Sequence, residues 1–147
     1  MTTATSVCEN PMCGCPSCTC ADCRCGVARL GDLESRVMDV VWAQSSHEPT
    51  VREVAQLFPD LAYTTVATML DRLTEKGVAR CRMERGTRRF AANGSRADYT
   101  AMYMYDTLRR TSETGEALAR FADIVSPTEA KALRAALQRR QRSGPNR

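Results

Sequence analysis

Seven cysteines crowd the first 26 residues of this 147-residue chain, and their spacing is regular. Three C-x-C pairs follow one another with two residues between neighbouring pairs, and one further cysteine precedes them. The seven are Cys8, Cys13, Cys15, Cys18, Cys20, Cys23 and Cys25. An odd number of thiols cannot close on itself as disulfides alone, whereas closely spaced thiolates on one chain can wrap soft metal ions. The pattern therefore predicts a metal-binding segment.

The softness of an all-thiolate ligand set favours Cu(I), followed by Zn(II) and then by an iron–sulfur cluster. A structural zinc site needs four ligands, and seven thiolates exceed that requirement. A polynuclear Cu(I)–thiolate cluster is therefore the first expectation. The spacing also resembles that of small bacterial metallothioneins, which supports metal binding but no particular metal. A redox-sensing thiol cluster and a simple metal store are the alternatives.

The composition of the N-terminal segment limits what else it can do. Residues 1–28 hold almost no apolar side chains, so they cannot build a core and are expected to be disordered without a ligand. The chain has no apolar run of membrane-spanning length and no secretory signal at its start. We therefore expect a cytoplasmic protein without membrane association, in which clustered thiols stay reduced. The net charge of +4 is compatible with a nucleic-acid partner without being diagnostic of one.

Beyond residue 29, apolar side chains recur at helical spacing and predict three short helices, over about residues 32–44, 51–58 and 62–76. The second helix follows a capping box, in which the Thr50 hydroxyl accepts from the amide of Glu53 and the Glu53 carboxylate reaches back. The inner face of the third helix is expected to consist of Val66, Met69, Leu70 and Leu73.

A two-stranded hairpin should follow the third helix. Apolar and polar side chains alternate over residues 78–84, which is the period of a half-buried strand. Residues 85–88 are expected to form the turn, and residues 89–92 the return strand. The side chains expected to point inward are Ala79, Cys81, Met83 and Phe90, with Cys81 as a buried core thiol.

The remainder of the chain is predicted to be helical. Residues 96–125 carry apolar side chains at helical spacing, with Gly115 as the expected break. A second helix should begin at Ser126, because Ser, Pro and Glu occupy its N-cap, first and third positions. The expected regions are a metal-binding tail (1–28), a DNA-binding domain (29–94), a helical dimerisation region (95–140) and a basic disordered end (141–147).

Three short helices followed by a hairpin are the elements of a winged helix-turn-helix, so the expected fold is mainly α, with C-terminal helices after the wing. The second helix of such a motif lies in the major groove of DNA and presents polar side chains to base edges. Cations at the wing tip can follow the phosphate backbone or enter the minor groove. The expected DNA-contacting residues are Arg52, Tyr63, Thr64, Thr65, Thr68, Arg72, Arg85 and Arg88, with Arg89 as a further wing-tip cation.

Several runs of residues resemble the penicillinase-repressor and copper-repressor family of transcriptional regulators. These runs are Leu30-Gly31-Asp32-Leu33-Glu34 with Val37-Met38 and Trp42, then Thr50-Val51-Arg52-Glu53-Val54, Leu61-Ala62-Tyr63-Thr64-Thr65-Val66 and Leu70-Asp71-Arg72-Leu73-Thr74-Glu75-Lys76-Gly77. The resemblance covers about residues 29–140. It implies a homodimer on a palindromic operator in double-stranded DNA, with the C-terminal helices forming the dimer. The Tyr- and Met-rich stretch from Tyr99 to Leu108 suits that interface or the core of one chain.

The chain also departs from this family. Its copper repressors carry their cysteine pairs at the C-terminus, whereas that end is Arg-rich and free of cysteine here. Its penicillinase repressors are inactivated by proteolysis, and no distinctive cleavage signal lies between Arg96 and Ser126. The expected inducer therefore rests on the cysteine array alone, which predicts a copper-responsive repressor whose DNA affinity changes on metal binding.

Other functions are compatible with the same features. One is a repressor of this family that responds to β-lactams, redox state or an iron–sulfur cluster. Another is a metal-buffering protein whose winged helix binds protein. The sequence shows no catalytic triad and no phosphate-binding loop, so we expect neither an enzyme nor a small-molecule substrate.

Overall fold

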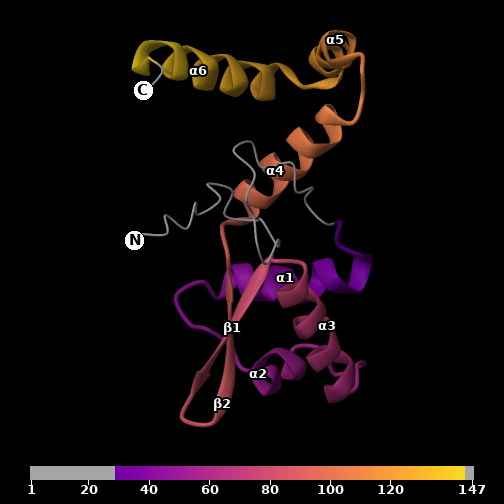
Figure 1. The fold of residues 1–147 in the computed structure, drawn as a ribbon, viewed down its shortest axis with the longest axis vertical. Coiled ribbons are helices and arrows are strands. Elements are labelled where there is room, and N and C mark those ends of the chain that lie inside the picture. Colours follow the sequence, from indigo (N-terminus) through magenta and orange to yellow (C-terminus); the bar gives the residue numbers. More distant parts are fainter. Residues whose placement is uncertain (1–28, 145–147) are drawn as a thin grey trace, which may run out of the picture. The chain divides into compact units, whose positions relative to one another are not determined.

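The computed structural model describes residues 29–144, and over these residues it confirms the predicted order of elements (Figure 1). In chain order the elements are α1 (Asp32–Ala43), α2 (Val51–Gln56), α3 (Tyr63–Glu75), β1 (Ala79–Glu84), β2 (Thr87–Ala92), α4 (Arg96–Arg109), α5 (Thr114–Ile124) and α6 (Pro127–Ser143). The mainly helical, winged fold is therefore confirmed. The seven N-terminal cysteines and the expected disorder of residues 1–28 lie outside the described residues.

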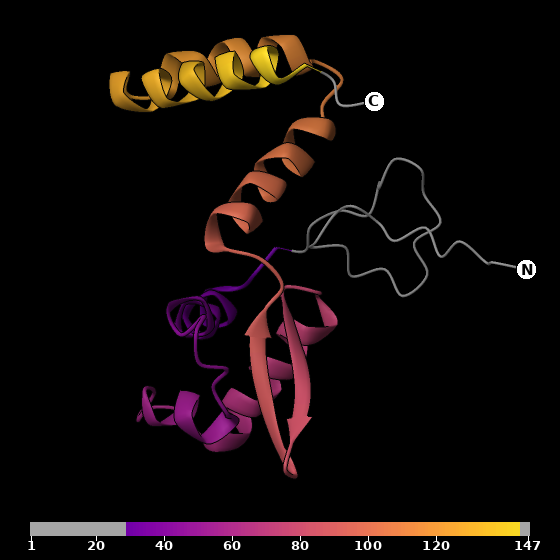
Figure 2. The same ribbon diagram turned by 90° about the vertical axis from the view of Figure 1, so that its left-hand side faces the viewer.

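The chain divides into two compact units between Asp106 and Thr107, inside helix α4. In the first unit, α1 and α2 both pack against α3, and the antiparallel hairpin of β1 and β2 packs against α1 and α3. Both ribbon views place α2, the beginning of α3 and the hairpin turn at the same end of this unit (Figures 1 and 2). This arrangement brings the parts expected to meet DNA together.

A single apolar cluster holds the first unit together. The predicted inner face of α3 is confirmed, because all four of its apolar side chains are buried. Phe90 of β2 is fully buried among them, as expected. The buried apolar residues are Leu30, Val37, Met38, Val41, Val51, Val54, Phe58, Val66, Met69, Leu70, Leu73, Val78, Ala79 and Phe90. Burial of each large side chain in this cluster contributes about 1.5–3 kcal/mol.

The beginning of α1 is held by Glu34, the one charged side chain buried among the described residues. Its Oε2 accepts hydrogen bonds from the amide of Gly31 at 2.9 Å and from Nζ of Lys76 at 2.5 Å. Burial alone would raise the pKa of Glu34, but these two donors outweigh it and lower the pKa below 4.5. Lys76 is the C-cap of α3, so this contact ties the start of α1 to the end of α3.

The tip of the wing differs from the prediction. Arg85 and Gly86 both have positive φ, at 49° and 77°, and together they form a two-residue turn. Two consecutive left-handed residues match the twist of the flanking strands, so pairing continues up to the turn itself. The predicted turn over 85–88 and strand over 89–92 are therefore wrong at their boundary. Strand β2 begins at Thr87, and Arg88 lies within it opposite Met83.

Two inward-facing residues of the hairpin are less covered than expected. Cys81 is half-buried and packs against the edge of the core, where the sequence predicted a buried thiol. The prediction for Met83 is wrong, because its side chain is 63% exposed. Met83 is exposed because the hairpin extends farther than the apolar core beneath it, whereas Cys81 is paired with the buried Phe90 and lies at the edge of that core.

In the second unit, the helical break lies at residues 110–113 and not at Gly115, which sits in the first turn of α5. The predicted start of the last helix is confirmed: the Ser126 hydroxyl accepts from the amide of Glu129 at 3.3 Å, and the Glu129 carboxylate accepts from the Ser126 amide. Helix α6 continues to Ser143, past residue 140 where we placed the end of the helical region. Neither α5 nor α6 buries a residue.

We predict that Glu34→Gln lowers the free energy of unfolding at neutral pH by about 1 kcal/mol, the difference between a charged and a neutral hydrogen bond. Because folding lowers the pKa of Glu34, its charge stabilises the fold above pH 4.5, and that contribution is lost as the pH falls through the folded value. Urea unfolding of both proteins over this range measures the difference. A gap that stays constant into acid would contradict the assignment.

Candidate nucleic-acid interface

The exposed face of α3 carries the polar residues predicted to read DNA. Thr64, Thr68, Asp71 and Arg72 are all exposed, on the side opposite the buried apolar stripe. The Thr68 hydroxyl donates to the carbonyl oxygen of Thr64 at 2.8 Å, so the lone pairs of the hydroxyl oxygen remain available to accept a hydrogen bond. One turn of helix separates these two threonines, so they present a short polar row of the width that enters a major groove.

The first turn of α3 is open to solvent. Its N-cap residue, Ala62, provides no side-chain hydrogen bond to the amides that follow, in contrast to the capping boxes at the starts of α2 and α6. Tyr63 is 57% exposed at this end, whereas Thr65 is half-buried at the side of the helix. Uncapped amides at a helix N-terminus favour an anionic partner.

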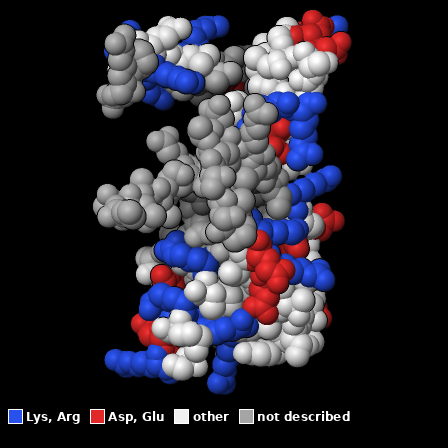
Figure 3. Space-filling view, viewed as in Figure 1, with Lys and Arg blue, Asp and Glu red and all other residues white. Residues whose placement is uncertain are grey.

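Three of the predicted cations make no ion pair within residues 29–144. Arg52 lies exposed in the first turn of α2, Arg72 lies exposed on α3, and Arg85 lies at the hairpin turn. The space-filling view shows basic side chains projecting from the end of the first unit where the hairpin turns (Figure 3). Exposed guanidinium groups of this kind suit phosphate contacts.

The other two wing arginines are engaged within the chain. Arg88 Nη1 donates to Oδ1 of Asp71 at 2.6 Å, and its guanidinium lies 5.3 Å from the ring centroid of Phe90. The hydrogen bond to Asp71 raises the pKa of Arg88. Arg89 was predicted at the wing tip, and this prediction is wrong. Its side chain lies on the face of β2 opposite to that of Arg88 and is bound to Glu48 and Glu84.

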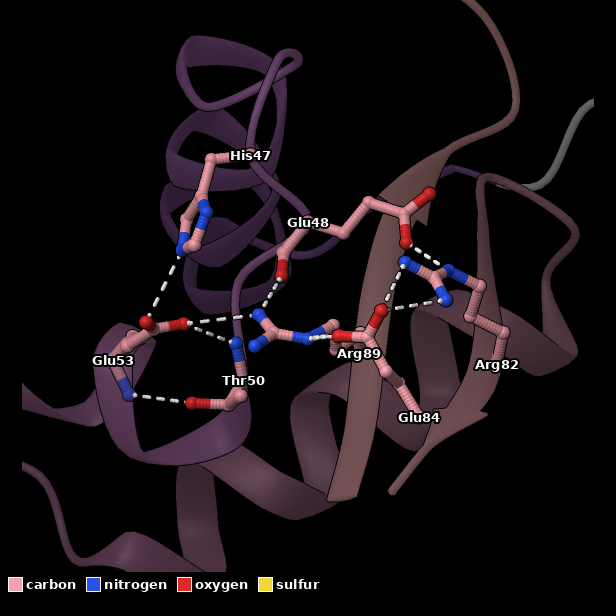
Figure 4. Close-up of polar contacts among 7 residues, drawn as sticks. All are labelled: His47, Glu48, Thr50, Glu53, Arg82, Glu84 and Arg89. Carbon is pink, nitrogen blue, oxygen red and sulfur yellow. Dashed lines mark hydrogen bonds and ion pairs between the residues drawn. The ribbon is translucent and has the colours of Figure 1, made fainter. Parts of the chain in front are cut away.

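A polar network joins the base of the wing to the start of α2 (Figure 4). Arg89 Nη1 donates to the carbonyl oxygen of Glu48 at 2.9 Å and lies 4.0 Å from a carboxylate oxygen of Glu53. Glu53 also accepts from the Thr50 amide at 2.7 Å and meets Nε2 of His47 at 3.1 Å. The Thr50 amide first, and then His47, lower the pKa of Glu53.

The network continues along β1, where Arg82 bonds to the carboxylates of Glu48 and Glu84. Sequence reasoning found the capping box but gave no role to His47 and missed Glu48. Their signal was weak, because each lies in a loop and meets residues that are adjacent only in the folded chain.

The predicted metal ligands cannot be placed, since all seven cysteines lie outside the described residues. Within residues 29–144, no group of three or more His, Cys, Asp or Glu side chains is arranged to hold a metal ion. No helix in this part of the chain is both long and apolar enough to cross a membrane.

The first unit is therefore a winged helix, in which α3 exposes a polar face and the hairpin turn carries a basic residue. A protein-family model described as Penicillinase repressor matches residues 30–139. This chain belongs to the penicillinase repressor family. Two relatives from Mycobacterium tuberculosis, strains CDC 1551 / Oshkosh and ATCC 25618 / H37Rv, are both named "Transcriptional regulator BlaI". Each is 38% identical over 125 residues, which cover 81% of this chain and 90% of the relative.

Membership of the penicillinase repressor family makes this chain a transcriptional repressor and not an enzyme. The match begins at residue 30 and ends at residue 139, so it includes the winged helix, α4, α5 and all but the last four residues of α6. It excludes all seven N-terminal cysteines. Family membership therefore assigns no function to these cysteines.

We predict that Thr50→Ala destabilises the first unit by about 1 kcal/mol, because the hydroxyl that accepts from the Glu53 amide at 3.2 Å is lost from the N-cap of α2. Thr50→Ser keeps the hydroxyl and is the matched control. Urea unfolding followed by circular dichroism compares the three proteins. Equal losses in both variants would show that the Thr50 methyl group, and not the cap, is what stabilises the fold.

Proposed function

We propose that this member of the penicillinase repressor family binds a palindromic DNA operator as a homodimer, and that metal binding by its N-terminal cysteines releases it. The observation that carries the DNA-binding part is α3 itself. Its apolar side faces the core, and its exposed side presents Thr64 and Thr68 beside an uncapped N-terminus. In helix-turn-helix proteins this helix enters the major groove.

Charge supports the same surface. The guanidinium groups of Arg52, Arg72 and Arg85 make no ion pair within residues 29–144, and they come from three different elements of one unit. Contacts from α2, from α3 and from the wing would fix the protein on the backbone, while the threonines meet base edges. Thr can donate or accept a hydrogen bond there, and its methyl group can touch a thymine methyl.

The C-terminal helices support a second copy of the chain as partner. Helices α5 and α6 bury no residue, although both carry apolar side chains. The large exposed ones are Leu118, Ile124, Leu133 and Leu137. Helices with this pattern are stabilised by burying their apolar side chains against a partner. A symmetric dimer would give both copies the same contact and would match a palindromic operator.

The metal part rests on the chemistry of the cysteine array. Thiolates are soft ligands and favour Cu(I), with Zn(II) second and an iron–sulfur cluster third. Metal binding by thiols releases protons, and seven thiolates that hold fewer than seven Cu(I) ions carry net negative charge. A negatively charged metal–thiolate cluster that directly precedes the winged helix in the chain would repel the DNA backbone.

The described structure offers a route from the tail to the reading helix. The carbonyl oxygen of Arg29 accepts from Nζ of Lys76 at 2.9 Å, and Lys76 is the C-cap of α3. The amide of Leu30 donates to the hydroxyl of Tyr99 in α4 at 3.3 Å. Residues 29 and 30 directly follow the tail (residues 1–28), so we propose that a change in the tail on metal binding acts on α3 through Lys76 and on α4 through Tyr99.

We predict that Thr64→Ala with Thr68→Ala weakens specific DNA binding by a few kcal/mol, because a good base contact contributes about 1–3 kcal/mol. Fluorescence anisotropy with the chain's own promoter DNA measures the affinity, and saturation at two chains per site is expected. Thr114→Ala, on α5, is the matched control. Unchanged affinity of the double variant would move the reading surface elsewhere, and absence of binding by the native chain would refute the operator proposal.

We predict that Cu(I), added anaerobically to the reduced native chain, weakens promoter binding by tenfold or more, which equals about 1.4 kcal/mol of coupling. A variant with all seven N-terminal cysteines replaced by Ser should bind the promoter as tightly as the metal-free native chain and ignore the metal. The same titration with Zn(II) ranks the two ions. Tighter binding with metal would reverse the proposed sign. A variant that still responds fully would show that these cysteines are not the sensor.

A further inference from the structure

The outer half of the wing extends beyond the apolar core. Near the base of the hairpin, Ala79 and Phe90 are buried, whereas Met83, on the same face but closer to the turn, is 63% exposed. Apolar packing therefore fixes the base of the wing and not its tip. The distance between the tip and α3 has to be set by another interaction.

Arg88 provides that interaction. Its Nη1 donates to Oδ1 of Asp71 at 2.6 Å, and its guanidinium group lies over the fully buried ring of Phe90. Asp71 follows Thr68 by three residues and Thr64 by seven, so all three lie on one face of α3. The ion pair thus connects the second residue of β2 directly to the face of α3 that carries the two threonines.

The next residue holds the strand from the other side. Consecutive residues of a strand point to opposite faces, so Arg89 faces away from α3. It donates to the backbone carbonyl of Glu48 at 2.9 Å and to the carboxylate of Glu84 (Figure 4). Strand β2 is therefore fixed to α3 by one arginine and to the loop before α2 by its neighbour.

We propose that the Arg88–Asp71 pair is a positioning element: it holds the wing at a fixed distance from the reading face of α3, the face that carries Thr64 and Thr68. We also propose that Arg88 does not itself contact the DNA backbone. This inference rests on the proposed binding of operator DNA. Arg85 is the wing's phosphate contact, because it lies at the turn and makes no ion pair among the residues that the structure describes. Pairing with Arg88 also neutralises Asp71, a carboxylate that would otherwise repel phosphates from the reading face.

The sign of one substitution separates this role from a simpler one. Suppose that Arg88 leaves Asp71 and binds a phosphate when DNA is present. Asp71→Ala would then free a cation, remove an anion and strengthen DNA binding. If the pair positions the wing, Asp71→Ala has the opposite effect. The wing is then no longer held at a fixed distance from α3, so specific binding weakens although the protein becomes more positive. Exposed ion pairs contribute little to stability, so Asp71→Ala is expected to fold.

The experiment uses the full-length, reduced, metal-free protein. Fluorescence anisotropy gives the affinity for promoter DNA and for an unrelated duplex over a range of salt concentrations. Asp71→Ala is matched by Glu75→Ala, which removes an exposed carboxylate from the same helix without breaking an ion pair. Arg88→Gln is matched by Arg85→Gln. Circular dichroism melting establishes that each variant is folded.

Asp71→Ala and Arg88→Gln should each lower promoter affinity by about five- to tenfold, at the low end of the coupling seen between linked sites. Asp71→Ala removes a negative charge, so it should not lower the affinity for the unrelated duplex, whereas Arg88→Gln leaves the Asp71 carboxylate unpaired and should lower that affinity slightly. The double variant removes both charges, so it should bind the unrelated duplex as the native chain does and the promoter no more weakly than either single variant. Arg85→Gln should remove one phosphate contact from each chain of the dimer. The slope of log affinity against log salt concentration should therefore become shallower by about 0.9 for each chain. Glu75→Ala should not lower promoter affinity.

Three results would overturn the positioning role while leaving DNA binding intact. The first is tighter promoter binding by Asp71→Ala, and the second is a loss of salt dependence in Arg88→Gln equal to that in Arg85→Gln. The third is unchanged promoter affinity in a folded Asp71→Ala variant, which would make the pair purely structural. If the native chain binds no promoter DNA, the proposed function itself fails, and that result is distinct from the other three.

Discussion

The burial of Val66, Leu70 and Leu73 fixes the rotation of α3 about its own axis, and the surface of the first unit depends on that rotation. These side chains pack against α1, α2 and β1, so no other face of the helix can turn inward. With 3.6 residues per turn, the residues left outside are those at the spacing of Thr64 and Thr68. The core therefore decides which side chains are available to a partner.

Charged groups then fix the parts that the core does not reach. Glu34 and Lys76 join the start of α1 to the end of α3. Thr50 and Glu53 close the start of α2, and the same Glu53 lies beside Arg89 of the wing. The helical residues in these contacts lie in a first turn or at a cap, where backbone amides or carbonyls lack partners within the element, whereas Arg89 lies within β2. The unit is thus apolar at its centre and tied by ionic contacts at its margins.

The sequence predicted features that depend on local patterns. The helical spacing of apolar residues located α1 and α3. The caps at Thr50 and Ser126 were confirmed, because a capping box depends on only four consecutive residues. Some of the differences concern the ends of elements, such as the helical break placed at Gly115, and others concern contacts between distant residues. The exposure of Met83 depends on how far the core extends, and the pairing of Arg88 depends on a two-residue turn that requires Arg85 to adopt a positive φ. No periodicity encodes either feature, and the asparagine or glycine that usually marks such a position is absent at Arg85.

The pairing of the hairpin arginines also determines how far the electric field of the protein reaches. The hairpin holds five arginines, of which Arg82, Arg88 and Arg89 are ion-paired. A neutralised pair has almost no field beyond the screening distance of about 8 Å at physiological ionic strength. The wing therefore attracts a polyanion from a distance much less than its composition suggests. Only Arg85 at the turn and Arg80 at the other end of β1 keep an unneutralised charge among the described residues of the hairpin, so two of the five hairpin arginines supply the attraction of the wing at long range.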